Sequence, residues 1–144
     1  MEYTEKLGKL GACGGAIHWC EEGKFPTLEK AWQSCERGDW MLWLIGELSG
    51  EPTSASRKKL VLAACECARL ALPYVTKGEK RPLQAIETAE RWANGDETVS
   101  LAMVRAAAAT NAAANAARIK TLKQCADIVR KHYPNSPSLK RTVN

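Results

Sequence analysis

The chain has 144 residues, of which 45% are hydrophobic, 26% charged and 6% aromatic, and its formal net charge is +5 at pH 7. This length and composition are typical of one globular domain, and they exclude collagen, coiled-coil and disordered classes. The longest apolar run, residues 40–45, is far too short to span a bilayer, and the first twenty residues lack the basic start and apolar centre of a secretion signal. We therefore expect a cytoplasmic protein that does not associate with a membrane.

Apolar residues recur at helical spacing along the whole chain, and no stretch alternates apolar with polar residues as a half-buried strand does. The sequence therefore predicts an all-α fold, a single compact array of about six helices. The first helix is expected over residues 4–21, although Gly11, Gly14 and Gly15 lower its helix propensity. Close approach by another helix would explain these glycines.

Two shorter helices follow, each with a suitable N-terminal cap. Thr27 precedes apolar positions at i, i+3, i+4 and i+7, which is the spacing of one buried helix face. Asp39 precedes residues 40–48, where six successive apolar residues leave no polar face. We expect Asp39 to cap this helix and the helix to lie at the centre of the core.

Three further helices complete the prediction, with Ser54 or Ser56 as the cap of the first and a proline in the first turn of the second. The last region contains ten alanines among residues 102–117, which predicts a long alanine-rich C-terminal helical region. We expect one helical domain over residues 1–134 and a polar, flexible tail over residues 135–144. The three predicted helices span residues 54–72, 82–93 and 98–132.

The six cysteines carry no signature of disulfides or of a metal site. Without an export signal we expect free thiols that fill apolar helix faces, as Cys13 and Cys20 would on one face. No CxxC pair occurs, and Cys65 and Cys67 point about 200° apart on a helix, so a zinc site would need a histidine from elsewhere. We predict no metal and no cofactor.

No enzyme motif is present: the sequence has no nucleophile elbow, zinc-protease helix, phosphate loop or dinucleotide fingerprint. His18 and Glu22, four residues apart, favour a surface pair over acid–base chemistry. The sequence therefore predicts that the protein is not an enzyme. We expect Trp32, Trp40 and Trp43 to lie in the core; the alternative is that they are exposed and anchor an interface. Trp92 is expected at the rim of the core.

The segment 31–44, AWQSCERGDWMLWL, resembles the immunity-protein family numbered five of bacterial polymorphic-toxin systems, in which an A-W-x-x-C-x-x-G-D-W-L-L-W-L segment occurs. Residues 60–73 and 85–92 are also similar, and related chains occur in phages. The resemblance implies an all-helical cytoplasmic protein that binds and neutralises a cognate toxin. It also implies that the motif positions define the fold; they are Trp32, Cys35, Gly38, Asp39, Trp40 and Trp43.

Positive charge is concentrated towards the C-terminus. From Arg105 onwards the chain has eight Lys and Arg residues against one acidic residue, Asp127. Such a region attracts an acidic protein surface or a phosphate backbone. We therefore expect a non-enzymatic protein inhibitor, either of the toxin-immunity type or a phage-encoded blocker of a host defence system, whose partner is a protein with an acidic surface. The candidate partner-binding residues are Arg118, Lys120, Lys123, Arg130 and Lys131.

The alternative function is nonspecific nucleic-acid binding through the same basic residues. Lysine and arginine side chains can neutralise phosphates without reading the base sequence. No helix-turn-helix, zinc finger or RNA-binding aromatic signature is present to support sequence-specific recognition.

Overall fold

The computed structural model describes residues 1–104 and 118–139, and for residues 118–120 it describes the backbone alone. The described residues contain helices and no strand, which confirms the all-α prediction. Residues 105–117, most of the predicted alanine-rich region, lie outside the described residues. The helices are α1 (Glu2–Leu10), α2 (Gly14–Glu22), α3 (Leu28–Ser34), α4 (Gly38–Leu48), α5 (Ala55–Arg69), the 3₁₀-helix η1 (Leu72–Tyr74), α6 (Arg81–Ala93) and α8 (Arg118–His132).

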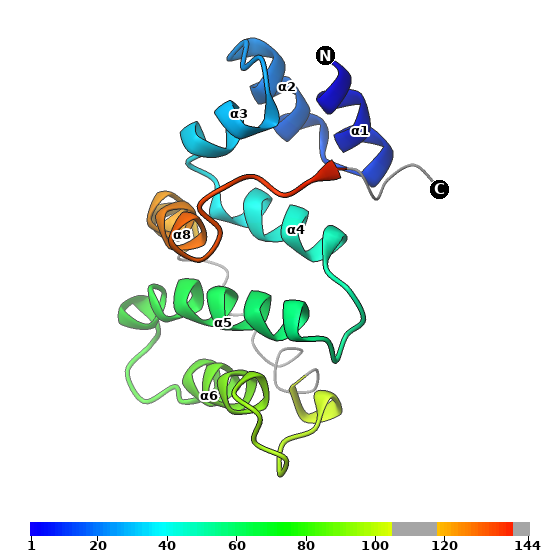
Figure 1. Ribbon diagram of the computed structural model, residues 1–144. Helices are drawn as coiled ribbons and strands as arrows, with labels where there is room; N and C mark the ends of the chain where they lie inside the picture. The colour runs from blue at the N-terminus through cyan, green and yellow to red at the C-terminus, as the bar shows by residue number, and fades with distance from the viewer. Residues whose placement is uncertain (105–117, 140–144) are drawn as a thin grey trace.

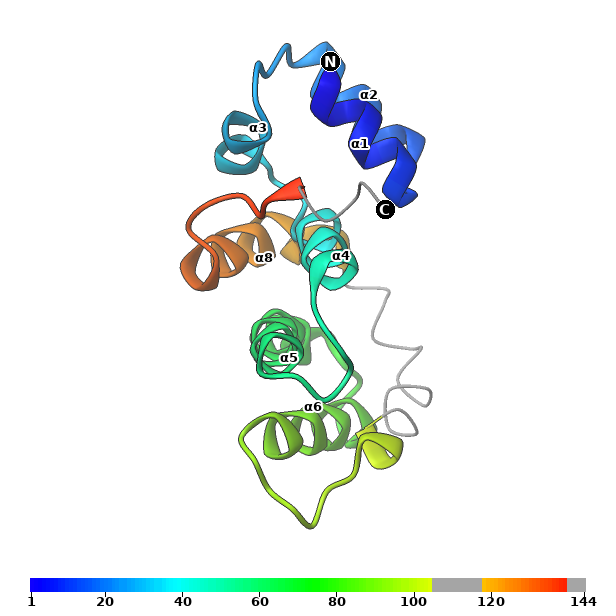
Figure 2. The same cartoon turned by 45° about the vertical axis from the view of Figure 1, so that its right-hand side comes forward.

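The helices are stacked in layers that follow chain order from α1 to α6, with one exception (Figures 1 and 2). Helix α8 lies between α4 and α5 and packs against both. The segment after α8 then crosses α4, and its last described residue lies near α1 (Figure 1). The last described helix therefore joins the N-terminal helices to α5 and α6.

The predicted first helix is in fact two helices, so the array has more helices than the six expected. Gly11 has a φ of 97°, a left-handed conformation that glycine adopts readily, and it ends α1. Its backbone N–H donates to the carbonyl of Gly8 at 3.0 Å. The close approach expected at these glycines is not found: an added Cβ would have nothing within 4 Å at Gly11 and Gly14, and at Gly15 it would make an ordinary contact of 3.8 Å with Cζ2 of Trp40.

Two of the predicted caps are confirmed. The hydroxyl of Thr27 accepts a hydrogen bond from the backbone N–H of Lys30 at 3.2 Å, and the hydroxyl of Ser54 accepts one from Arg57 at 3.2 Å. Both hydroxyls satisfy a donor that the first turn of a helix leaves without an intrahelical partner. Pro82 likewise lies in the first turn of α6 as predicted.

The predicted cap at Asp39 is wrong. Helix α4 begins at Gly38, two residues earlier than predicted, so that Asp39 lies in its first turn and Arg37 occupies the cap position. The Asp39 carboxylate instead accepts two hydrogen bonds from the Arg37 guanidinium, at 2.9 and 2.8 Å. The same guanidinium lies 4.2 Å from the centre of the Trp40 ring. Asp39 therefore orients Arg37 on the face of a tryptophan.

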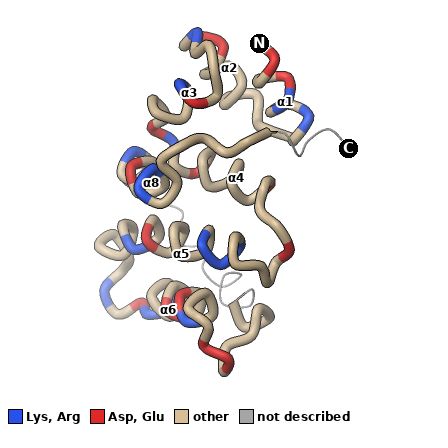
Figure 3. The backbone as a smooth tube through the Cα atoms, viewed as in Figure 1, with Lys and Arg blue, Asp and Glu red and all other residues tan. Residues whose placement is uncertain are grey.

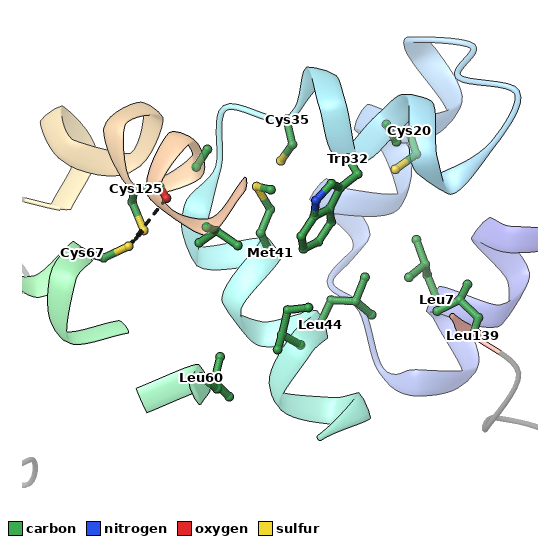
Figure 4. Packing of buried hydrophobic residues seen from close by; sticks show 14 residues of the cluster. Leu7, Cys20, Trp32, Cys35, Met41, Leu44, Leu60, Cys67, Cys125 and Leu139 are labelled. Carbon is green, nitrogen blue, oxygen red and sulfur yellow. Dashed lines mark hydrogen bonds between the residues drawn. The ribbon is translucent and has the colours of Figure 1, made fainter. Parts of the chain in front are cut away.

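The core is centred on the inner faces of α4 and α8 (Figure 4). Ala126 and Val129 of α8 have no exposed surface, and Met41 of α4 is 2% exposed. Trp32 is buried, as predicted, while Trp40 and Trp43 are only half-buried. The structure also buries Trp92, which the sequence places at the rim.

Helices α4 and α8 approach most closely at Gly38. A Cβ placed on Gly38 would collide with the side chain of Cys125 and would lie 2.6 Å from the backbone nitrogen of Ala126. The backbone of α8 cannot move aside without disturbing the packing of the fully buried Ala126. Only glycine therefore fits at this crossing.

The segment that follows α8 is hydrogen-bonded to α3. The indole N–H of Trp32 donates to the carbonyl of Tyr133 at 2.9 Å, and the backbone N–H of Ser136 donates to the Glu29 carboxylate at 2.6 Å. This backbone donor is the main reason that the pKa of Glu29 is lowered. Leu139, inside the stretch that the sequence assigns to a polar tail, is buried in the core.

The crossing at Gly38 makes a testable prediction about stability. Gly38→Ala should lower the free energy of unfolding by about 2–3 kcal/mol, because the added methyl group overpacks a site bounded by backbone. Gly46→Ala is the matched control on the same helix, since its Cβ would meet Leu60 and Arg57 side chains at 3.6 and 3.7 Å, an ordinary contact. It should be neutral or stabilising by up to about 1 kcal/mol. Urea unfolding measures both, and equal stability of the two variants would contradict the close crossing.

Candidate partner-binding surface

All five predicted partner-binding residues lie on α8, which spans Arg118–His132. The side chains of Arg118 and Lys120 lie outside what the structure describes, and the other three are described. Each of these three is paired with groups of the same chain. Charge concentrated in one part of the sequence is thus partly balanced by Glu36 and Glu66, which are distant in the chain.

Lys123 and Lys131 are the exposed members of the set. The Lys123 side chain is 71% exposed, and its ammonium lies 3.6 Å from the Glu36 carboxylate. The Lys131 side chain is 62% exposed and donates to Glu66 of α5 at 2.6 Å. Exposed ion pairs of this kind contribute little to stability, so their partners can be exchanged at small cost.

Arg130 has a different environment. Its side chain is 18% exposed, and Nη1 donates to the backbone carbonyls of Trp32 and Cys35 at 3.0 and 2.6 Å. Its Nη2 donates to Asp127 at 2.8 Å. Arg130 therefore caps the end of α3 and fixes α3 to α8, a structural task that leaves little of its guanidinium for a partner.

The carboxylate of Glu66 is the centre of a small charged cluster where α5 meets the end of α8. The hydrogen bond from Lys131 is the main cause of its lowered pKa, and His132 contributes to the same direction. His132 Nε2 lies 3.6 Å from the second carboxylate oxygen. Glu66 is therefore ionised at neutral pH and holds Lys131 on the outer side of the α5–α8 contact.

Figure 3 shows Lys and Arg positions of α8 beside acidic positions on α8 and its neighbouring helices. Such an arrangement presents cations that are already oriented and already close to a carboxylate. A partner that offers its own carboxylates can replace Glu36 and Glu66 without reorganising the backbone. Among the described side chains of α8, Lys123 and Lys131 are therefore exposed cations that already lie close to a carboxylate.

A second feature, which the sequence does not predict, lies among the N-terminal helices. A half-open cavity of about 430 Å³ separates α1 and α2 from α3 and α4, with the Arg37–Asp39 pair and the exposed Cys13 in its lining. Cavities of this size and apolar character accept hydrophobic side chains or small ligands. Four of the five tryptophans line it; they are Trp19, Trp32, Trp40 and Trp43.

Sequence patterns miss these contacts because the partners are far apart in the chain. Lys131 and Glu66 are 65 positions apart, and Arg130 and Trp32 are 98 positions apart. The four tryptophans occur at helical spacing, which predicts burial equally well for a filled core and for the wall of a cavity. The one local signal is the Arg37–Gly38–Asp39 string, in which Arg37 and Asp39 pair and Gly38 permits the helix crossing.

Among the described residues, no three His, Cys, Asp or Glu side chains form a group that could hold a metal ion. Within the same part of the chain, no helix has the length and apolar character needed to cross a membrane.

The fold is an all-helical array, and its family is defined by comparison with known sequences. The sequence profile of the family described as "Imm-5 like putative immunity protein" matches residues 51–133. Because this span is more than half of the 144 residues, the chain belongs to this family. The match contains α5, α6 and α8 and leaves out the 31–44 motif on which the sequence resemblance mainly depends. Searches of curated proteins and of solved structures found no match.

The contrast between Arg130 and Lys123 can be tested by mutation. Arg130→Met keeps the aliphatic stem and removes the donors to two backbone carbonyls, so the free energy of unfolding should fall by about 2 kcal/mol. Lys123→Met should change it by less than about 0.5 kcal/mol, because the Lys123 pair is exposed. Urea unfolding compares the two variants with the parent. An Arg130→Met variant as stable as the parent would contradict the structural role of Arg130.

Proposed function

We propose that this protein is a non-enzymatic immunity protein that binds a cognate protein toxin in the cytoplasm and neutralises it. The observation that carries the proposal is the family match over residues 51–133, since this span contains the helix that bears the candidate partner-binding residues. The family name supports a protein partner in general. We propose to search for the toxin among the genes beside the one that encodes this chain.

The proposed binding surface is the outer side of α8, with Lys123 and Lys131 as the exposed cations and Arg118 and Lys120 earlier on the same helix. Helix α8 is packed against α4 and α5 and is held to α3 through Arg130. A surface on so well-supported a helix loses little conformational freedom on binding, which favours affinity. We propose a toxin whose contact surface is acidic, because its carboxylates would replace Glu36 and Glu66.

A co-expression assay tests the proposed function. The toxin domain encoded next to this gene should arrest growth of a bacterial host, and co-expression of this chain should restore growth. The purified proteins should then form a complex that is measurable by biolayer interferometry. Failure to bind and failure to rescue growth against every toxin domain encoded nearby would contradict the proposal.

A charge reversal tests the proposed surface. Lys123→Glu with Lys131→Glu should slow association with the toxin about tenfold and reduce its salt dependence, because cations on α8 steer the encounter. Lys24→Glu with Lys77→Glu is the matched control: it changes the net charge equally at exposed positions outside α8. The control should bind like the parent. Equal slowing in both double variants would show that net charge alone sets the association rate, and it would contradict α8 as the toxin-binding surface.

The same proteins distinguish a protein partner from a nucleic acid. If α8 instead contacts phosphates, the parent should bind arbitrary duplexes below micromolar Kd at physiological salt. The affinity should then fall with salt at a log–log slope near −0.9 for each neutralised phosphate. A gel-shift titration at two salt concentrations measures this, and such binding without toxin binding would contradict the proposed function.

A further inference from the structure

Two buried cysteines from different helices face each other across the α5–α8 contact. The Sγ atoms of Cys67 and Cys125 are 2.6 Å apart, and the two residues are 8% and 7% exposed (Figure 4). The Cys67 thiol also lies 3.6 Å from the backbone carbonyl of Cys125. All six cysteines lie in the described residues, and all are free thiols. The thiol of Cys65, two residues before Cys67, contacts the backbone carbonyl of Ile86 and not another cysteine.

The packing around the pair fixes its geometry. Gly38 of α4 is in contact with the side chain of Cys125 on one side, and α5 brings Cys67 to it on the other. A disulfide has an S–S length of about 2.05 Å, so bond formation would need a movement of about half an ångström.

A small oxidant can reach the two sulfur atoms. Both cysteines line a cavity of about 260 Å³ between α4, α5, α6 and α8, whose other lining residues include Leu42, Ala64 and Thr121. A space of this volume is many times larger than a single water molecule requires. Hydrogen peroxide, which is little larger than water, therefore has room beside the pair.

We propose that Cys67 and Cys125 are a site of oxidative modification, at which a hydroperoxide converts the two thiols into a disulfide that joins α5 to α8. In the first step one sulfur attacks the peroxide O–O bond, giving a sulfenic acid and one water. In the second step the other sulfur attacks the sulfenic sulfur, and the hydroxyl leaves with the thiol proton as a second water. Two thiols and one hydrogen peroxide thus give one disulfide and two waters.

Cys67 and Cys125 are the expected site of the disulfide because their sulfur atoms are close together, and not because either thiol is unusually reactive. The hydrogen bond with Cys125, together with burial, raises the pKa of the Cys67 thiol. At neutral pH the Cys67 thiol is therefore protonated and its reaction with peroxide is slow. Cys13 is exposed, so peroxide reaches it more readily than it reaches the buried pair. The stable product of prolonged oxidation is the Cys67–Cys125 bond.

The bond would join residues that are 58 positions apart. Closing so long a loop restricts the unfolded chain strongly, so the oxidised protein should melt at a higher temperature than the reduced one. It would also fix α8 to α5 covalently. This inference concerns the fold itself and does not depend on toxin binding.

Mass spectrometry of a Cys13→Ser variant tests the proposal, because this exposed substitution removes the competing surface thiol. The variant is treated with hydrogen peroxide, denatured without reductant and alkylated. We expect five alkylated cysteines before oxidation and three after it, with the mass before alkylation lower by two hydrogen atoms. A protease digest should contain a peptide pair linked through Cys67 and Cys125. The melting temperature should rise by roughly 10 °C and return on reduction.

Two further variants serve as controls. Adding Cys65→Ser to the Cys13→Ser variant changes a buried thiol of the same helix and should leave the linkage intact, whereas adding Cys125→Ser should abolish the linkage and the peroxide-induced rise in melting temperature. Five alkylated sites after prolonged peroxide treatment of the folded Cys13→Ser variant would overturn the proposal. A linkage that joins any other pair of cysteines would overturn it as well. Both outcomes are read from the Cys13→Ser protein alone, so they hold even if Cys125→Ser fails to fold.

Discussion

The structure depends on the contact of α4 with α8 at Gly38, where a glycine allows the start of one helix to touch the backbone of the other. This contact places Ala126 and Val129 in the centre of the core, so that α8 can serve as a shared wall for α3, α4 and α5. Arg130 then caps α3 from the same helix. One small residue thus determines how closely the N-terminal helices can approach the family-matched part of the chain.

Charge follows the same architecture. Lys123 and Lys131 of α8 lie next to Glu36 and Glu66, so these two cations are oriented by carboxylates from the turn before α4 and from α5. A surface of this kind combines weak internal pairs with a rigid backbone. In the proposed complex, carboxylates of the toxin would take the place of Glu36 and Glu66.

Local rules predict the local parts of this fold well. Thr27, Ser54 and Pro82 lie where capping chemistry and the geometry of the first helical turn place them, because each is determined by neighbours within four residues. Asp39 departs from this rule, because its carboxylate pairs with Arg37 and does not cap the helix. The pairing of Lys131 with Glu66 and the cavity walled by tryptophans depend on tertiary contacts, which helical periodicity in a single sequence does not encode.

The hydrogen bond from the Trp32 indole to the carbonyl of Tyr133 has a consequence for folding during translation. Its two partners are 101 residues apart, so α3 reaches the ribosome exit well before the segment that completes it. At usual synthesis rates this interval is roughly 5–20 s. During that time Trp32 and the apolar face of α4 lack their cover, and the nascent N-terminal helices are a substrate for chaperones until α8 arrives.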